Sequence, residues 1–204
     1  MMRLIGTLDS PYARRVAASL AMMDLPVALE PLSVFRDLDA FAAINPVVKA
    51  PTLVLDDGIQ RIDPTLILEF AERLTTAERH LTPAATADYV TAQRVIGLAL
   101  AACEKTMQIA YERRLRPIEK QHQPWLERIQ AQLIAAHTLL DTCYAEEDDW
   151  LAGAVHCRPT SPRRSPGQFT RAIVPDIVTL ERAPALAALS LRAAARPAFL
   201  AFPG

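Results

Sequence analysis

The stretch KAPTLVLDDG, residues 49–58, predicts a strand that ends in a tight hairpin turn. Its apolar run is typical of a buried strand, and Asp56-Asp57-Gly58 favours a turn because Gly accepts the backbone angles that hairpins require. Residues 60–62 are the expected returning strand. Beyond them, Asp63 and Pro64 open a helix, since Asp is a preferred N-cap and Pro suits the first helical position.

Upstream of this stretch, residues 3–8 and 27–32 are short apolar runs that predict two strands. Residues 12–23 between them have helical periodicity with one apolar face, and we expect the pair Arg14-Arg15 to face away from that core. A strand, a helix and a strand in this order predict a parallel strand pair. With a short helix at 40–44, the order is β-α-β, then α, then β-β-α.

The composition changes after residue 75. Residues 75–88 are polar, whereas 89–115 and 124–145 show long helical patterns rich in Ala and Leu. We therefore expect an α/β domain at 1–76, a linker at 77–88 and an all-helical domain at 89–204. The expected apolar faces are Leu66, Ile67, Phe70 and Leu74 on the helix after Pro64, and Trp125, Ile129, Leu133, Leu139 and Leu140 on the second long helix.

Several motifs in this order resemble the soluble glutathione S-transferase family over nearly the whole chain. They are SPYARRV at 10–16, INPVVKAPTLVLDDG at 44–58, IDPTLILEF at 62–70, Arg116-Pro117, Trp125 and Trp150-Leu151-Ala152-Gly153. The most similar subgroup is that of small bacterial transferases of the serine type. The resemblance implies a thioredoxin-like N-terminal domain, an all-α C-terminal domain, glutathione as co-substrate and a homodimer.

Ser10 lies between the first strand and the following helix, so its hydroxyl can point out beside a helix N-terminus. The glutathione thiol is mostly protonated at neutral pH, because the ordinary pKa of a thiol lies well above 7. The resemblance implies that Ser10 donates to the sulfur and stabilises the thiolate. Two alternatives stay open: Ser10 merely caps the helix, or Tyr12 supplies the hydroxyl.

Ala50-Pro51 resembles the family's cis-proline site. The resemblance implies that the Ala50 N–H and C=O pair with the cysteinyl backbone of glutathione, as an added strand would. Lys49 is a candidate for neutralising the glycyl carboxylate, although a solvated lysine is equally consistent with the sequence. Arg36 is a weaker candidate for the same carboxylate.

Asp63-Pro64 departs from the family pattern, in which an acid precedes a serine that holds the γ-glutamyl carboxylate. Pro64 has neither the hydroxyl nor the N–H, so we expect weaker glutathione binding than in relatives with serine. Thr65 partly compensates through its own N–H and hydroxyl. Asp63 is expected to pair with the γ-glutamyl ammonium group.

A second departure lies at 158–167, a basic and proline-rich run. Relatives have a Ser/Thr-x-x-Asp capping box that starts a buried helix here, whereas Arg163 stands where the acid belongs after Thr160. Pro162 and Pro166 disfavour a continuous helix. We expect local disorder or reduced stability over these residues.

The leading hypothesis is an enzyme that conjugates glutathione to a small hydrophobic electrophile, or runs a related glutathione-dependent reaction. The alternative is a non-catalytic module on the same fold that binds glutathione or a protein partner. A thiol–disulfide oxidoreductase is disfavoured, because position 10 is Ser and the three cysteines form no CxxC pair.

Other partners are disfavoured by composition. The formal net charge is −1 with mixed charges, so no nucleic-acid partner is expected. No metal is expected, because His80, His122, His137 and His156 are scattered. No run approaches the roughly 20 apolar residues of a membrane helix and no signal peptide is evident, so we expect no membrane partner and a cytoplasmic location.

Overall fold

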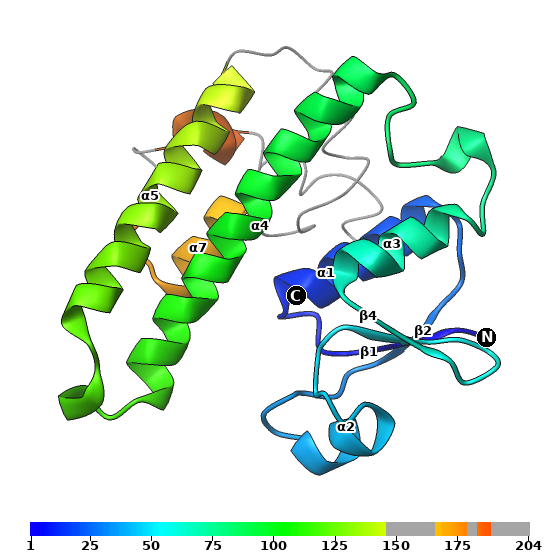
Figure 1. The fold of residues 1–204 in the computed structure, drawn as a ribbon, viewed down its shortest axis with the longest axis horizontal. Coiled ribbons are helices and arrows are strands. Elements are labelled where there is room, and N and C mark those ends of the chain that lie inside the picture. The colour runs from blue at the N-terminus through cyan, green and yellow to red at the C-terminus, as the bar shows by residue number, and fades with distance from the viewer. Residues whose placement is uncertain (146–165, 179–182, 189–204) are drawn as a thin grey trace. The chain divides into compact units, whose positions relative to one another are not determined.

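The computed structural model describes residues 1–145, 166–178 and 183–188 of the chain (Figure 1). The chain divides into two compact units, of which the first starts at Met1 and ends at Thr82 and the second starts at Pro83. The first unit contains β1 (Arg3–Ile5), α1 (Pro11–Met22), β2 (Ala28–Glu30), α2 (Leu38–Ile44), β3 (Thr52–Val54), β4 (Gln60–Ile62) and α3 (Pro64–Glu72). The predicted β-α-β, α, β-β-α order is confirmed.

The four strands form one sheet in the order β2-β1-β3-β4. β1 and β2 are parallel, as predicted, and the other two pairs are antiparallel. Side chains alternate between the two faces of the sheet. Leu4 and Leu53 therefore join the core under α1 and α3, whereas Ile5 and Val54 pack with Phe41 of α2 on the other face (Figure 1).

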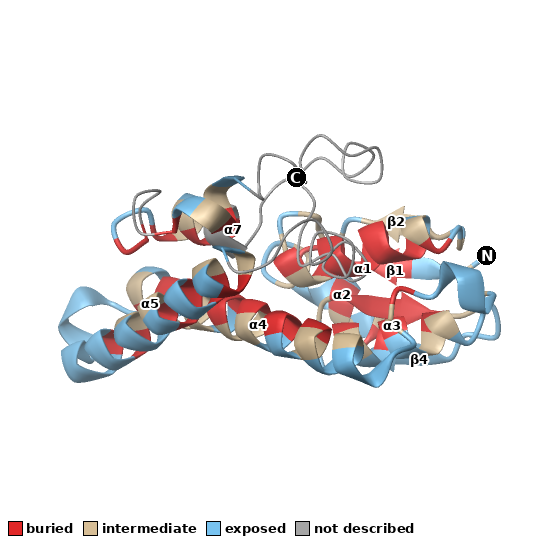
Figure 2. Cartoon of the chain, turned by 90° about the horizontal axis from the view of Figure 1, so that it is seen from above, coloured by how far each residue is buried: buried red, intermediate tan, exposed pale blue. Residues whose placement is uncertain are grey.

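The expectation that Arg14 and Arg15 face away from the core is wrong. Each side chain is only 1% exposed, and every residue of α1 from 13 to 20 is buried (Figure 2). Periodicity identifies the most apolar face of a helix but does not reveal whether the opposite face is covered as well. Arg15 tolerates burial in part because its Nη1 donates a hydrogen bond to Thr65 Oγ1 (3.2 Å).

The apolar face expected for α3 is partly wrong. Leu66 is 59% exposed and Leu74 is 46% exposed. The buried residues of α3 are Pro64, Ile67, Leu68 and Ala71. Their spacing of three, one and three residues places them in one stripe along the helix. Leu66 is apolar, but its position lies outside this stripe.

The second unit contains α4 (Thr86–Leu115), the 3₁₀ turn η2 (Ile118–Lys120), α5 (Gln123–Ala145) and α7 (Pro166–Ile173). α4 and α5 pack together, and α7 packs against α4. The buried face of α5 consists of Leu126, Ile129, Leu133, Ala136, His137, Leu140 and Cys143. The expected members Trp125 and Leu139 are instead 39% and 46% exposed, because they lie one position away from this stripe.

The segment between α3 and α4 packs onto the first unit over part of its length. It contains the 3₁₀ turn η1 (Ala77–Arg79). Arg79 Nη1 pairs with Asp24 Oδ2 at 2.9 Å, and the N–H of buried Leu81 donates to Glu72 Oε1 at 3.1 Å. These contacts attach residues 79–81 to the sheet-bearing unit.

The predicted disorder at 158–167 falls almost entirely outside the described residues, as does the expected turn at 150–153. Pro166 and Gly167 are described, and they form the first turn of α7, where proline needs no N–H. Cys103 and Cys143 are buried, as their place in the helical apolar patterns suggests. In the part of the chain that the structure describes, no helix is both long and apolar enough to cross a bilayer.

Candidate functional site

The register of the sheet brings three predicted site segments to one edge. Ile5 pairs with Thr52, and Thr52 pairs with Ile62 on its other side. The chain leaves β1 toward Ser10, enters β3 from Ala50-Pro51 and leaves β4 into Asp63-Pro64-Thr65, all at this end of the sheet. Residues far apart in the sequence, such as Ile5 and Thr52, therefore become neighbours.

Gly6 lies where these segments meet. Its φ of +143° is a conformation that residues with a side chain rarely adopt. A Cβ built on it would lie 3.4 Å from the Ala13 Cβ, 3.5 Å from the Ala50 Cβ and 3.7 Å from the Pro51 Cα. These distances are ordinary contacts for a Cβ, so the backbone conformation is what calls for glycine at position 6, and only a side chain larger than Ala would be crowded there. Gly6 is not among the predicted site residues, although a lone Gly directly after a strand is a sequence signal for such a position.

Ser10 is the N-cap of α1. Its Oγ accepts a hydrogen bond from the Ala13 N–H at 3.4 Å, which is long for such a bond. The side chain is half-buried. Since a hydroxyl can accept and donate at once, the capping bond leaves the Ser10 O–H proton available for an anion outside the helix. Capping and thiolate binding are thus compatible roles for this residue.

The loop before β3 is held by buried polar groups. Asn45 Nδ2 donates to Thr52 Oγ1 (2.9 Å), and the Thr52 hydroxyl donates to the Lys49 carbonyl (2.7 Å). The Asn45 side chain also accepts from the Val47 N–H (3.0 Å). The Ala50–Pro51 peptide bond is cis, as the resemblance implied. Asn45 and Thr52 thereby hold the backbone that precedes the cis bond.

The start of α3 confirms the predicted cap. Asp63 Oδ1 accepts a hydrogen bond from the Thr65 N–H at 2.9 Å, and Pro64 occupies the first turn. Asp63 has φ of +70°, a backbone conformation that is uncommon for residues other than Gly and that clusters at ligand sites. The Thr65 hydroxyl accepts from buried Arg15. The Thr65 N–H is thus engaged by Asp63, while the hydroxyl proton of Thr65 can still be donated.

A comparison with protein families matches residues 4–79 to the glutathione S-transferase N-terminal domain. These residues span the sheet, its helices and all three site segments. The first unit matches the N-terminal domain of glutathione S-transferases. No curated protein matches the chain in sequence.

Solved structures of glutathione transferases share the fold over nearly the whole chain. One from Methylobacterium radiotolerans, in complex with glutathione sulfonate, has a TM-score of 0.85 and 25% identity, covering 98% of this chain and 93% of that one. One from Methylobacillus flagellatus, with glutathione bound, has a TM-score of 0.84 and 22% identity, covering 99% of this chain and 98% of that one. A glutathione transferase family member from Pseudomonas fluorescens, also with bound glutathione, has a TM-score of 0.80 and 24% identity, covering 99% of this chain and 98% of that one.

The remaining candidates in the first unit are less closely associated with the site segments. Lys49 and Arg36 have exposed side chains, and Tyr12 is half-buried. In the described part of the chain, the charged groups of Lys49 and Arg36 form no hydrogen bond with the site segments. Among the described residues, no group of three or more His, Cys, Asp or Glu side chains could hold a metal ion.

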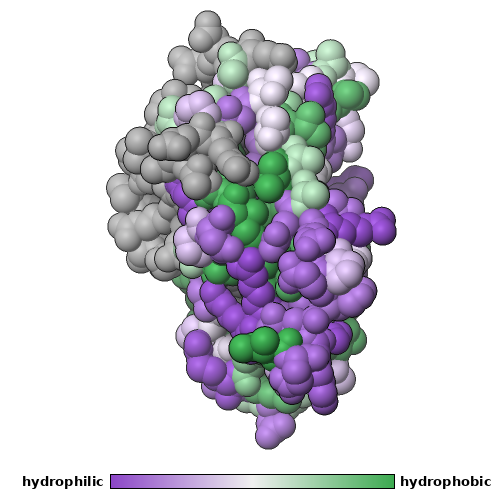
Figure 3. Space-filling view, turned by 90° about the vertical axis from the view of Figure 1, so that its left-hand side faces the viewer, coloured by the Kyte–Doolittle hydropathy of each residue, from purple (hydrophilic) through white to green (hydrophobic). Residues whose placement is uncertain are grey.

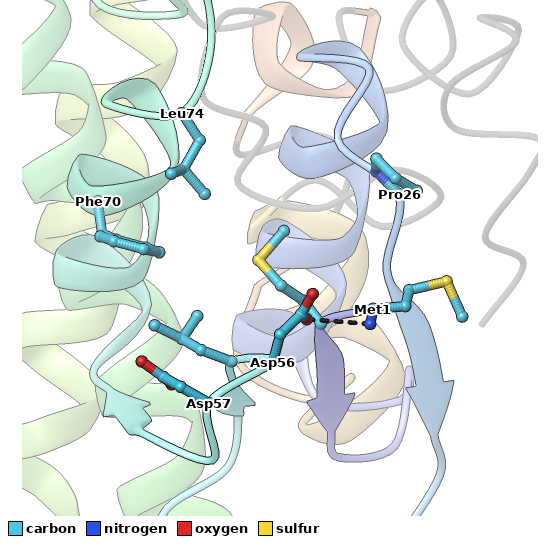
Figure 4. A pocket seen from close by; sticks show the side chains of 8 residues that line it. Met1, Pro26, Asp56, Asp57, Phe70 and Leu74 are labelled. Carbon is cyan, nitrogen blue, oxygen red and sulfur yellow. Dashed lines mark ion pairs between the residues drawn. The ribbon is translucent and has the colours of Figure 1, made fainter.

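The first unit also has a cavity of about 580 Å³ at the opposite end of its sheet (Figure 4). It is lined by Met1, Met2, Pro26, Leu55, Asp56, Asp57, Phe70 and Leu74. The Met1 amino nitrogen lies 3.0 Å from Asp56 Oδ1, and Phe70 of α3 and Leu74, two residues after the end of α3, lie on the same side of the cavity (Figure 4). Met2 precedes β1 and Leu55 follows β3, whereas Ile5 and Thr52 lie at the other end of these strands, so the cavity is separate from the candidate site.

Proposed function

We propose that the chain binds glutathione at the Ser10, Ala50-Pro51 and Asp63–Thr65 edge of the sheet and transfers it to a small hydrophobic electrophile. The observation that carries this proposal is the convergence of a helix-capping hydroxyl with a proline loop at one sheet edge. The structures that share this fold with bound glutathione support the choice of ligand.

In the proposed mechanism, Ser10 donates its hydroxyl proton in a hydrogen bond to the glutathione sulfur. The N-terminal end of α1 adds a partial positive charge beside the same atom. Both interactions favour the thiolate and lower the pKa of the bound thiol. The thiolate then attacks the electrophilic carbon, the leaving group departs with its electron pair, and the thiol proton goes to solvent.

The γ-glutamyl carboxylate is proposed to lie near Thr65 in place of the missing serine. Arg15 donates into the Thr65 oxygen, so the Thr65 proton is directed away from Arg15 and toward the ligand. The buried guanidinium also polarises that hydroxyl and adds positive charge close to the carboxylate. Arg15 is therefore a positioning residue, and Thr65 is the donor that touches the ligand.

Replacing Thr65 by Val is expected to weaken glutathione affinity about 5-fold, the equivalent of one hydrogen bond of about 1 kcal/mol. Arg15→Met is expected to cause a similar loss. The double variant should bind glutathione only slightly more weakly than either single variant, because each single substitution already disrupts the same hydrogen bond from Thr65 to the ligand. Isothermal titration calorimetry measures all three affinities.

Arg14→Met is the matched control, because Arg14 is as deeply buried as Arg15. It removes a second guanidinium while leaving the bond between Arg15 and Thr65 in place. Affinity losses in Arg15→Met and Thr65→Val that add fully in the double variant would contradict the coupled arrangement.

A Pro64→Ser variant is expected to bind glutathione several-fold more tightly than the wild type. Serine restores a hydroxyl and a backbone N–H at the first turn of α3, and each added hydrogen bond contributes about 1 kcal/mol. Pro64→Ala is the control, since it restores the N–H without the hydroxyl. Calorimetry showing no gain for Pro64→Ser would refute the interpretation that Pro64 weakens this end of the site.

The alternative function, a non-catalytic glutathione-binding or protein-binding module, is favoured by the start of α3. Pro64 offers no donor, and Asp63 already engages the Thr65 N–H. The deciding experiment measures glutathione affinity by calorimetry together with turnover of chlorodinitrobenzene. Tight binding without turnover would favour the alternative. The domain limits at 76 and 89, the homodimer and the cytoplasmic location stay predictions.

A further inference from the structure

Asn45 and Thr52 are polar side chains that are buried beside the loop before β3. Asn45 is 3% exposed and Thr52 is 0% exposed. Apolar groups on a protein surface are common, and Figure 3 shows several of them set among hydrophilic groups on one face of the molecule. Buried polar side chains are less common and are retained with hydrogen-bond partners, so their bonds indicate what they hold in place.

The backbone of Asn45 is fixed on both sides. Its N–H donates to the Phe41 carbonyl at 2.8 Å, at the end of α2, and its carbonyl accepts from the Val48 N–H at 2.9 Å. One residue earlier, the Ile44 carbonyl accepts from the side chain of Gln60 in β4. The Asn45 side chain therefore extends from a backbone that is already ordered.

The orientation of the Asn45 amide follows from its neighbours. The Val47 N–H can only donate, so the Asn45 atom that lies 3.0 Å from it is the oxygen. The amide nitrogen therefore faces Thr52 Oγ1 and donates to it at 2.9 Å. Because the hydroxyl oxygen accepts that bond, its own proton is directed to the Lys49 carbonyl at 2.7 Å. The hydrogen bonds thus run in one direction, from Asn45 through Thr52 to Lys49.

The last bond of this chain fixes the plane of the Lys49–Ala50 peptide. That peptide bond is trans, and in a planar trans peptide the C=O and the N–H point in opposite directions. Holding the Lys49 carbonyl on buried Thr52 therefore turns the Ala50 N–H away from the interior. In the described part of the chain, the Ala50 N–H donates to no other group. It is available to an acceptor on a ligand.

We propose that Asn45 and Thr52 are positioning residues that aim the Ala50 N–H at the cysteinyl carbonyl of glutathione. This inference rests on the proposed function, in which the Ala50 backbone pairs with the cysteinyl backbone of the ligand. Both side chains are buried, so they act through the Lys49–Ala50 peptide rather than by touching glutathione. A donor that is already aimed needs little ordering on binding, and its hydrogen bond adds more to the affinity.

Thr52→Val removes the hydroxyl and keeps a β-branched side chain that suits a strand. The Lys49 carbonyl is then released, and the dissociation constant of glutathione is expected to rise about 5-fold, the equivalent of one hydrogen bond. The KM for glutathione should rise with it, whereas kcat at saturating glutathione should change little, because Ser10 is untouched. Thr52→Ser keeps the hydroxyl and is expected to bind glutathione nearly as tightly as the wild type. Calorimetry and steady-state kinetics measure these values.

Asn45→Asp tests the direction of the hydrogen bonds. One carboxylate oxygen still accepts from the Val47 N–H, but the other can only accept and competes with the Lys49 carbonyl for the Thr52 proton. The affinity loss should resemble that of Thr52→Val, and the double variant should bind only slightly more weakly than either single variant. In the NMR spectrum, the Ala50 amide proton is expected to move downfield on glutathione binding in the wild type and to move less in both variants.

Thr106→Val is the matched control. Thr106 is also 0% exposed, its hydroxyl donates to the Ala102 carbonyl at 2.8 Å, and its oxygen lies 2.8 Å from Thr170 Oγ1. The substitution therefore removes similar buried hydrogen bonds from the second unit. Its melting temperature should fall as that of Thr52→Val does, but its glutathione affinity should equal that of the wild type.

The possible failures are distinguishable. A wild-type protein that does not bind glutathione would overturn the proposed function and this inference with it. Wild-type binding together with unchanged affinity in Thr52→Val and Asn45→Asp would overturn only the positioning role. Equal affinity losses in Thr52→Val and Thr106→Val would assign the effect to stability instead. If Thr52→Val does not fold, Asn45→Asp gives the same test, since it changes one donor group to an acceptor without changing the shape of the side chain.

Discussion

Replacing Ser10 by Ala is expected to lower chlorodinitrobenzene turnover about 100-fold. A loss of this size is typical when one hydrogen-bond donor to the reacting anion, here the thiolate, is removed. Glutathione affinity should fall much less, because the contacts proposed for the Ala50 backbone and the Thr65 hydroxyl remain in the variant. The defect should shrink as the pH rises, since the thiol pKa is raised in the variant and high pH restores the thiolate without a donor. Ultraviolet absorbance of the bound thiolate against pH measures this pKa directly.

Ser10→Thr is the control for this variant, because it keeps a hydroxyl at the N-cap of α1. Its turnover should remain much closer to that of the wild type than the turnover of Ser10→Ala does. The loss of the cap itself is expected to cost about 0.5 kcal/mol of folding free energy, at the low end of the usual range because the Ala13 N–H bond is long. If Ser10→Ala turns over at the wild-type rate, Ser10 is only a cap, and Tyr12 becomes the next donor to test.

A Gly6→Val variant is expected to lose about 4 kcal/mol of unfolding free energy, combining backbone strain with overpacking. The strain arises because φ is +143°, and the overpacking arises because a side chain here meets Ala13, Ala50 and Pro51. Denaturant unfolding measures the loss. In the protein that remains folded, the loop before β3 is displaced, so glutathione affinity should fall as well.

Gly58→Val separates the two causes. Gly58 also has a positive φ, of +85°, but a Cβ on it would meet no atom within 4 Å. Its variant should therefore show only the strain, about 1 to 3 kcal/mol, and unchanged glutathione affinity. Equal stability losses in the two variants would mean that crowding at Gly6 contributes nothing.

Much of the first unit could be predicted from local patterns. The hairpin at 56–58, the Asp63 cap and the proline at the start of α3 depend on interactions within a few residues, and the structure has all of them. The parallel pairing of β1 and β2 follows from the helix between them. Such features are independent of what the rest of the chain does, so a sequence pattern is sufficient to indicate them.

The wrong predictions concern which side of a helix is buried by other elements. Arg14 and Arg15 are buried although they are charged, and Leu66, Leu74 and Leu139 are exposed although they are apolar. Hydrophobicity ranks residues by their average preference, but burial depends on whether another element lies over that position. Helix spacing was the better guide for α3 and α5, where the buried residues follow an unbroken stripe.

By itself, the sequence determined the order of elements, the turn and cap chemistry, and Ser10, Ala50-Pro51 and Asp63 as candidate site residues. Only the tertiary structure decided that these segments share one edge of the sheet, because the pairing of Ile5, Thr52 and Ile62 is a long-range register. The contact from Arg15 to Thr65, across 50 residues, and the approach of Gly6 to Ala50 follow from that register. No local pattern encodes a distance between residues so far apart in the chain, because strand pairing and helix packing together set it.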